Sequence, residues 1–171
     1  MEKYNFFGCE VEVDLETTQS WYAAAKPQRR LYDKEANTRN FRALARKRQL
    51  PAFVLEHLDK LGIPPQKATY IQFQCAEEDG TDRYAFSYRI AGNILSGYLP
   101  GVDPDDYARL YLVDLDDDAE WPWADLGRCI HEPSPICPPE FPKPHFDLEF
   151  YASLPWVLDE PRKEGLDRLH Q

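Results

Sequence analysis

Short segments in which apolar and polar residues alternate recur along this chain, and they restrict its fold more than any other feature. In the clearest of them, residues 83–90, the apolar phase consists of Tyr84, Phe86, Tyr88 and Ile90. A period of two places successive side chains on opposite faces of a β-strand, whereas a helix needs a period of about 3.6. We therefore expect a β-sheet that buries one apolar face.

The same alternation predicts five more strands, and the residues between them indicate how the strands connect. These segments are residues 4–16, 68–75, 94–99, 107–113 and 146–150. The dipeptide Gly92-Asn93 is typical of a two-residue hairpin turn, and Glu78-Asp79-Gly80 marks another turn. Consecutive strands joined by short turns indicate an antiparallel meander.

Helical spacing is found between the first strand and the others. We expect a short helix that begins at Trp21 and is stopped by Pro27, then helices over residues 37–49 and 51–62. The last two have apolar positions on one side, as in a helical hairpin that packs on a sheet. The fold prediction is a single α+β domain over residues 1–161, an antiparallel β-sheet covered by this hairpin. Residues 162–171 form a polar tail that we expect to be frayed.

The charge of the chain is strongly negative and unevenly distributed. The 20 basic and 30 acidic side chains give a formal net charge of -10. Between Lys26 and Arg48, however, nine basic residues stand against two acidic ones. In the helix there, Arg39, Arg42 and Arg46 form a stripe that we interpret as a solvated face pairing loosely with the protein's own carboxylates. The overall charge disfavours direct binding to nucleic acid and favours a basic partner.

The densest run of negative charge is one stretch, which we call the acidic segment. It contains nine carboxylates within 23 residues and a single basic residue, Arg109. These carboxylates are Asp103, Asp105, Asp106, Asp114, Asp116, Asp117, Asp118, Glu120 and Asp125, and two aromatic residues, Trp121 and Trp123, lie among them. Crowded carboxylates repel one another until a cation or a basic protein arrives, and tryptophans beside them are typical interface anchors. A solvated loop whose tryptophans fill the core is the alternative.

A proline-rich stretch that follows offers ligands for a metal. Cys129, His131, Cys137 and His145 supply the thiolates and imidazoles that Zn²⁺ prefers, and four of them complete a tetrahedron. Cys9 or Cys75, each expected to be buried in a strand, is an alternative to His145. The prolines alone are the other explanation, because they would stiffen this loop without a metal.

No recognised catalytic motif is present in the sequence. The G-x-S-x-G, P-loop, G-x-G-x-x-G and H-E-x-x-H patterns are all missing. Glu10, Glu12 and Asp14 would be the carboxylates of a magnesium-dependent nuclease, but any exposed acidic strand shows this pattern. The sequence therefore favours a protein that is not an enzyme, with a carboxylate-dependent hydrolase as an alternative.

Three motifs resemble those of an uncharacterised family of small cytosolic proteins from Firmicutes. They are Arg39-Asn40-Phe41, the segment from Leu50-Pro51 to Leu61-Gly62-Ile63-Pro64, and Phe146-Asp147-Leu148-Glu149-Phe150 before Leu154-Pro155-Trp156. The resemblance implies cysteines just before the Arg-Asn-Phe motif, where this chain has Glu35 and Thr38 instead. It implies a cytosolic protein and transfers no activity.

These observations lead to one functional hypothesis and two alternatives. The hypothesis is a non-enzymatic acidic protein that inhibits a basic nucleic-acid-handling protein, such as a nuclease or a CRISPR effector, and that zinc stabilises. Anti-CRISPR proteins and nuclease immunity proteins are the classes meant. The alternatives are a structural zinc-binding module with an unknown partner and the hydrolase. With no signal peptide and no apolar stretch near 20 residues, we expect a cytoplasmic protein that does not enter a membrane.

Overall fold

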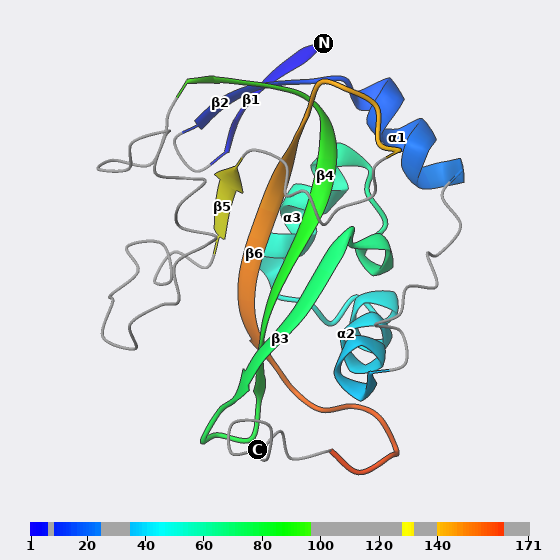
Figure 1. Ribbon diagram of the computed structural model, residues 1–171, viewed down its shortest axis with the longest axis vertical. Coiled ribbons are helices and arrows are strands. Elements are labelled where there is room, and N and C mark those ends of the chain that lie inside the picture. Colours follow the sequence, from blue (N-terminus) through cyan, green and yellow to red (C-terminus); the bar gives the residue numbers. More distant parts are fainter. Residues whose placement is uncertain (7–8, 25–34, 97–127, 132–139, 163–171) are drawn as a thin grey trace.

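The described part of the chain is built on one antiparallel sheet of six strands. The computed structural model describes residues 1–6, 9–24, 35–96, 128–131 and 140–162 (Figure 1). The strands are β1 (Glu2–Phe6), β2 (Cys9–Val13), β3 (Tyr70–Ala76), β4 (Asp82–Ser96), β5 (Arg128–His131) and β6 (His145–Leu154). They are ordered β1-β2-β4-β6-β5, and β3 also pairs with β4. The α+β class with an antiparallel sheet is confirmed.

Strand β4 is the centre of this sheet, because three other strands pair with it. β6 pairs with residues 82–91 of β4, β3 with residues 82–87, and β2 with residues 92–96. The hairpin turn expected at Gly92-Asn93 is wrong, since β4 continues through both residues as one strand. The glycine has a different role: Gly92 has φ 149° and lies opposite Val13 of β2.

Replacing Gly92 by alanine is expected to lower the free energy of unfolding by about 1–3 kcal/mol. A Cβ atom at Gly92 would lie 2.0 Å from the carbonyl oxygen of Glu12, so the β2 and β4 backbones would have to separate. Chemical denaturation of both proteins measures the difference. Gly80→Ala is the control, because Gly80 also has positive φ (84°) but no atom within 4 Å of the added Cβ. Equal losses in the two variants would contradict the close-approach argument.

The alternating stretch at the N-terminus forms two strands and the start of a helix, where one strand was expected. Phe6 pairs with Cys9, so β1 and β2 are the arms of a hairpin. Helix α1 (Leu15–Ala24) then begins six residues before the expected start at Trp21. Asp14 explains the early start, because its carboxylate accepts hydrogen bonds from the backbone N–H (2.9 Å) and hydroxyl (2.8 Å) of Thr17. Such a cap satisfies a donor of the first helical turn.

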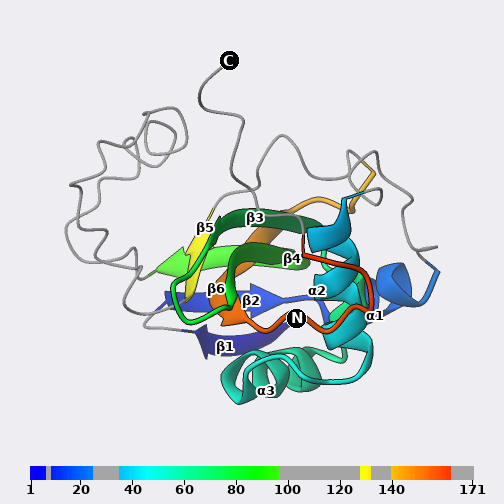
Figure 2. The ribbon, with the colours of Figure 1, turned by 90° about the horizontal axis from the view of Figure 1, so that it is seen from below.

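The expected helical hairpin is confirmed as α2 (Ala36–Arg46) and α3 (Ala52–Leu61). α3 ends where Gly62 adopts a left-handed conformation (φ 67°), which glycine tolerates best. A short 3-10 turn, η2 (Pro65–Lys67), leads into β3. All three α-helices lie on one side of the sheet in the described part of the chain (Figure 2). None of the described helices has the length and apolarity needed to cross a membrane.

The hydrophobic core lies between the helices and one face of β4 and β6. Phe86 and Phe150 are cross-strand partners on this face, and both are fully buried. Phe41 of α2 packs on Phe86 with ring centroids 4.7 Å apart, and Phe53 of α3 packs on Phe150 at 6.1 Å. Tyr88 is buried on the same face and donates its hydroxyl to the carbonyl of Pro65 (2.7 Å). The apolar phase of the sequence thus forms the core.

The segment after β6, residues 155–162, is held against α2 and the β3–β4 turn. Asn40 of α2 is fully buried and binds the backbone of this segment at Pro155 and Val157. Arg39 forms an ion pair with Glu160, and Arg162 pairs with Asp82. Arg162 also donates to the carbonyls of Gly80 and Thr81, so the first residue of the expected tail is bound. Residues 163–171 lie outside the described chain.

Candidate functional site

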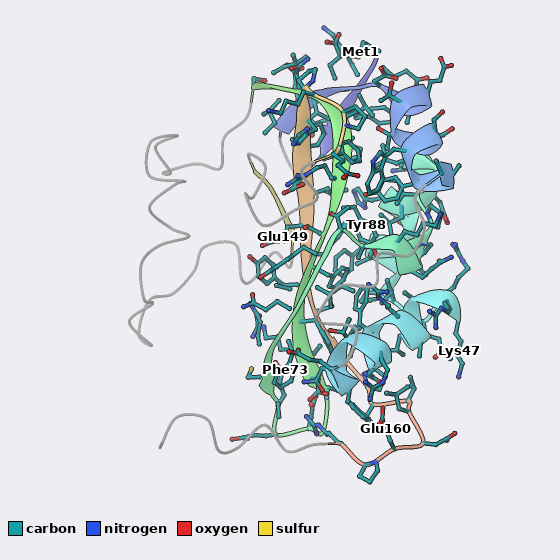
Figure 3. All side chains as sticks on the ribbon, turned by 45° about the vertical axis from the view of Figure 1, so that its right-hand side comes forward. Met1, Lys47, Phe73, Tyr88, Glu149 and Glu160 are labelled. Atoms are coloured by element: carbon teal, nitrogen blue, oxygen red, sulfur yellow. The ribbon has the colours of Figure 1, made fainter. Side chains whose placement is uncertain are left out.

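The face of the sheet that points away from the helices is polar, yet it is buried. Alternate residues of β4 and β6 form it, and Ser87, Arg89, Asp147 and Glu149 are all less than 5% exposed. Figure 3 shows Tyr88 on the helix side of the sheet and Glu149 on the opposite side. Buried charges need partners, because removing them from water is costly. This polar face is therefore the most unusual chemical environment in the described part of the chain.

An ion pair between β4 and β6 lies at the centre of the polar face. Arg89 and Asp147 are direct cross-strand partners. The Arg89 Nε donates to Asp147 Oδ1 at 2.8 Å, and its Nη2 donates to Oδ2 at 3.0 Å. The two side chains are 3% and 0% exposed. This bidentate geometry is the strongest form of an arginine–carboxylate interaction.

Glu149 and Ser87 form the next row of the polar face. They are opposite each other on β6 and β4. The Glu149 carboxylate accepts a hydrogen bond from the hydroxyl of Tyr151, which is two residues along on the same face. The Glu149 side chain is only 4% exposed, so a charge at this position is largely removed from water.

Strand β5 extends both rows to the edge of the sheet. Its register places Cys129 opposite Glu149 and His131 opposite Asp147. Directly opposite residues of an antiparallel pair share one face. Two of the expected zinc ligands therefore occupy positions on the polar face. Cys137, the third, lies outside the described residues.

His145, the fourth expected ligand, is also on β6 but farther along the strand. Its Nδ1–H donates to the carbonyl of Pro142 (2.9 Å), which leaves Nε2 as the acceptor of a neutral ring. Burial is the main reason that the pKa of His145 lies below its ordinary value. His145 precedes Glu149 by four residues, which is about 13 Å along a strand. Cys129 is opposite Glu149, so its position on β5 is separated from that of His145 by about this length along the sheet.

The structure also describes Cys75, the alternative zinc ligand, and the acidic residues considered for magnesium. Cys75, expected to be buried, is exposed, because a register shift between Phe73 and Cys75 breaks the alternation of β3. Two of the three carboxylates considered for magnesium accept hydrogen bonds within the protein: Asp14 caps α1, and Glu10 accepts a hydrogen bond from Ser96 at 3.0 Å. Accepting the two bonds from Thr17 holds the pKa of Asp14 below its ordinary value. Among the side chains that the structure describes, no three His, Cys, Asp or Glu residues are grouped to hold a metal ion.

The expected partner-binding residues belong to the acidic segment, which lies outside the described residues. Their role therefore stays a prediction for Asp103, Asp105, Asp106, Asp116, Asp117, Asp118, Glu120, Trp121 and Trp123. The basic stripe of α2 can be assessed in part. Arg39 pairs with Glu160 at 2.5 Å, and the nearby Arg48 pairs with Asp59 at 2.7 Å. These pairs agree with a face whose arginines bind the protein's own carboxylates.

Comparisons with protein-family models, with curated protein sequences and with solved structures found no match for this chain. The candidate site therefore rests on its own geometry. Sequence reasoning did not single out Arg89, Asp147 or Glu149, although each lies between two large apolar residues. Charged residues inside such strongly apolar strands were the available signal.

Proposed function

We propose that this protein is a non-enzymatic acidic binding protein of the cytoplasm that inhibits a basic nucleic-acid-handling protein, of the anti-CRISPR or nuclease-immunity type. The acidic segment carries the proposal: nine carboxylates against one arginine, with Trp121 and Trp123 among them. Like charges at this density destabilise the isolated protein through mutual repulsion. A basic partner removes that repulsion when it binds.

The ion pairs of the structure also support this proposal, because they occupy basic residues that a nucleic-acid-binding protein would use. Each of five arginines pairs with a carboxylate of the same chain: Arg39, Arg48, Arg83, Arg89 and Arg162. These arginines are engaged within the protein and are less suited to holding a phosphate backbone. Each pair cancels one charge of either sign, so the formal net charge of -10 remains on the other carboxylates. The excess favours a basic surface as the partner.

The charges and the aromatic residues would contribute to different steps of binding. Carboxylates attract a basic protein at long range and raise the association rate, an effect that salt screens. Tryptophans buried in the complex slow its dissociation, because they remove large apolar areas from water. Inhibition follows when the bound carboxylates occupy the basic surface on which the target holds nucleic acid.

The test is the binding of the whole protein to a panel of purified basic nucleases and CRISPR effectors at increasing salt. We expect inhibition of at least one of them, with an affinity that falls as salt rises. Replacing Asp116, Asp117 and Asp118 by asparagine should lower the association rate roughly tenfold at low salt. Surface-based kinetics and a nuclease assay measure these effects.

The matched control removes the same charge elsewhere. Glu56, Glu78 and Glu140 are exposed outside the acidic segment, and their replacement by glutamine changes the net charge equally. We expect this control to bind and inhibit nearly as well as the original protein. Equal losses in the two triple variants would show that only net charge matters. Binding that ignores salt, or no inhibition across the panel, would refute the proposal.

A further inference from the structure

Strand β3 forms one margin of the described sheet. It pairs with β4 and with no other strand in the described part of the chain. The opposite edge of β4 at these residues is occupied by β6. Figure 2 shows β3 at one margin of the sheet and β1 at the other. An edge strand presents a row of backbone N–H and C=O groups to which another strand can be added.

β3 lacks the charges that protect most edge strands from such pairing. Natural edge strands commonly carry charged residues or prolines, or are very short. β3 has seven residues, and none of them is charged or a proline. By comparison, β1 has the exposed residues Glu2 and Lys3, and β5 has only four residues. A register shift between Phe73 and Cys75 interrupts the end of β3 but leaves residues 70–73 regular. Among the described edge strands, β3 is therefore the one best suited to pairing with another strand.

We propose that β3 pairs with β3 of a second copy of this chain, antiparallel and about a two-fold axis at Gln72, so that the two sheets become one. A two-fold axis perpendicular to the sheet brings the same surface of both copies together and keeps their helices on one side. Ile71 then lies opposite Phe73 of the partner subunit, and Gln72 lies opposite Gln72 of the partner subunit. This dimer does not depend on the proposed function, and each proposal can fail without the other.

The apolar side of β3 complements itself in this register. Ile71 and Phe73 lie opposite Phe86 and Tyr84 of β4, on the helix side of the sheet, and both are only partly buried. The symmetry of the dimer forms the isoleucine–phenylalanine pair twice. Pairs of an aromatic and a β-branched residue stabilise antiparallel strands. The pairing also removes from water apolar surface that one copy leaves exposed.

The other side of β3 is also compatible with a second copy. Gln72 is exposed and lies opposite Ala85 of β4. A glutamine amide has both donors and an acceptor, so it can form a hydrogen bond with an identical amide opposite it. The register sets no like charges opposite each other within β3, since the strand has none. A second copy thus complements both sides of β3, whereas a basic strand would find no carboxylate on it.

Antiparallel pairing also keeps the negative charges next to β3 apart. Each copy has a formal net charge of -10, and the turn that follows β3 contains Glu77, Glu78 and Asp79. Glu77 is five residues from Gln72, so the turns of the two copies lie at opposite ends of the paired strands, about 33 Å apart. The Debye length is about 8 Å at physiological salt. Repulsion between the two turns is therefore screened.

Sedimentation equilibrium of the whole protein at physiological salt tests the dimer. At concentrations up to about 100 μM we expect twice the 19.9 kDa mass of one chain. Gln72→Lys places two ammonium groups opposite each other at the axis, so the dissociation constant should rise at least roughly tenfold. Gln72→Thr is neutral and favours a strand, so it should stay dimeric. Gln49→Lys adds the same charge at an exposed position outside β3 and should stay dimeric too.

Disulfide cross-linking tests the register. Directly opposite residues have Cα atoms about 4.5–5.5 Å apart, which a disulfide can span. Gln72→Cys in a Cys75→Ser background should therefore give a covalent dimer on oxidation. The Cys75→Ser protein alone is the control for the other cysteines. In the original protein, the Cys75 positions of the two copies are about 20 Å apart and should not cross-link.

A dimer that separates in Gln72→Lys and cross-links through Gln72→Cys supports the proposal. A monomer over the whole concentration range, or a dimer that lacks either response, overturns it. A monomer whose Gln72→Lys variant loses binding to a target from the panel of nucleases and effectors would assign the β3 edge to that target and would overturn the second copy as its partner.

Discussion

Replacing Arg89 by methionine is expected to lower the free energy of unfolding by about 3–5 kcal/mol. The substitution leaves the Asp147 carboxylate buried at 0% exposure without the two hydrogen bonds that Arg89 donates. The cost of leaving a buried carboxylate without its ion-pair partner, rather than the strength of the ion pair itself, accounts for the magnitude. Urea denaturation followed by tryptophan fluorescence measures it.

Two further variants make this prediction specific to a buried pair. Arg48→Met breaks the surface pair with Asp59, whose side chains are 52% and 56% exposed, and should cost no more than about 1 kcal/mol. The double replacement Arg89→Met with Asp147→Leu removes both charges, so it should cost less than the Arg89 variant alone. A loss in Arg89→Met as small as that in Arg48→Met would show that Asp147 finds another partner or is reached by water.

The helices and the apolar face could be predicted from the sequence because their signals are local. The spacing of Phe41, Leu44 and Ala45 specifies the buried side of α2, and all three are buried. Gly62 marks the end of α3 because a left-handed residue there favours glycine. Alternation in residues 84–90 likewise identifies which side chains of β4 meet the helices. Each of these features depends on residues within a few positions of one another.

The polar face could not be predicted, because alternation does not distinguish a polar face in water from one that is buried. Arg89 and Asp147 are 58 residues apart, and only the pairing of β4 with β6 brings them together. The register also decides where the expected zinc ligands of β5 lie: it places Cys129 opposite Glu149 and His131 opposite Asp147, which spacing along the chain does not reveal. The turn expected at Gly92 is wrong for the same reason. Its sequence context predicts a turn, but the glycine is needed because the backbones of β2 and β4 approach closely at this position.

Asn40 is a second buried polar residue that joins parts of the chain distant in sequence. It lies on the helix side of the sheet and connects α2 with β4 and with the segment after β6. Its Nδ2 donates to the carbonyl of Pro155 (3.0 Å) and to the Tyr84 hydroxyl (3.3 Å). Its Oδ1 accepts the backbone N–H of Val157 at 2.8 Å. This explains why a polar residue is 0% exposed in the middle of α2 and precedes Phe41, a core residue.

Asn40→Ala should therefore lower the free energy of unfolding by about 2–4 kcal/mol, because it leaves backbone groups of Pro155 and Val157 without their partner. Denaturation measures this loss, and hydrogen exchange localises it: the Val157 amide should exchange faster than in the original protein. Asn37→Ala is the control on the same helix, since only the backbone carbonyl of Asn37 is needed to accept the Tyr84 hydroxyl. It should cost less than about 1 kcal/mol. If Asn40→Ala left the exchange of Val157 unchanged, segment 155–162 would be held mainly by the ion pairs of Arg39 and Arg162 instead of by this amide.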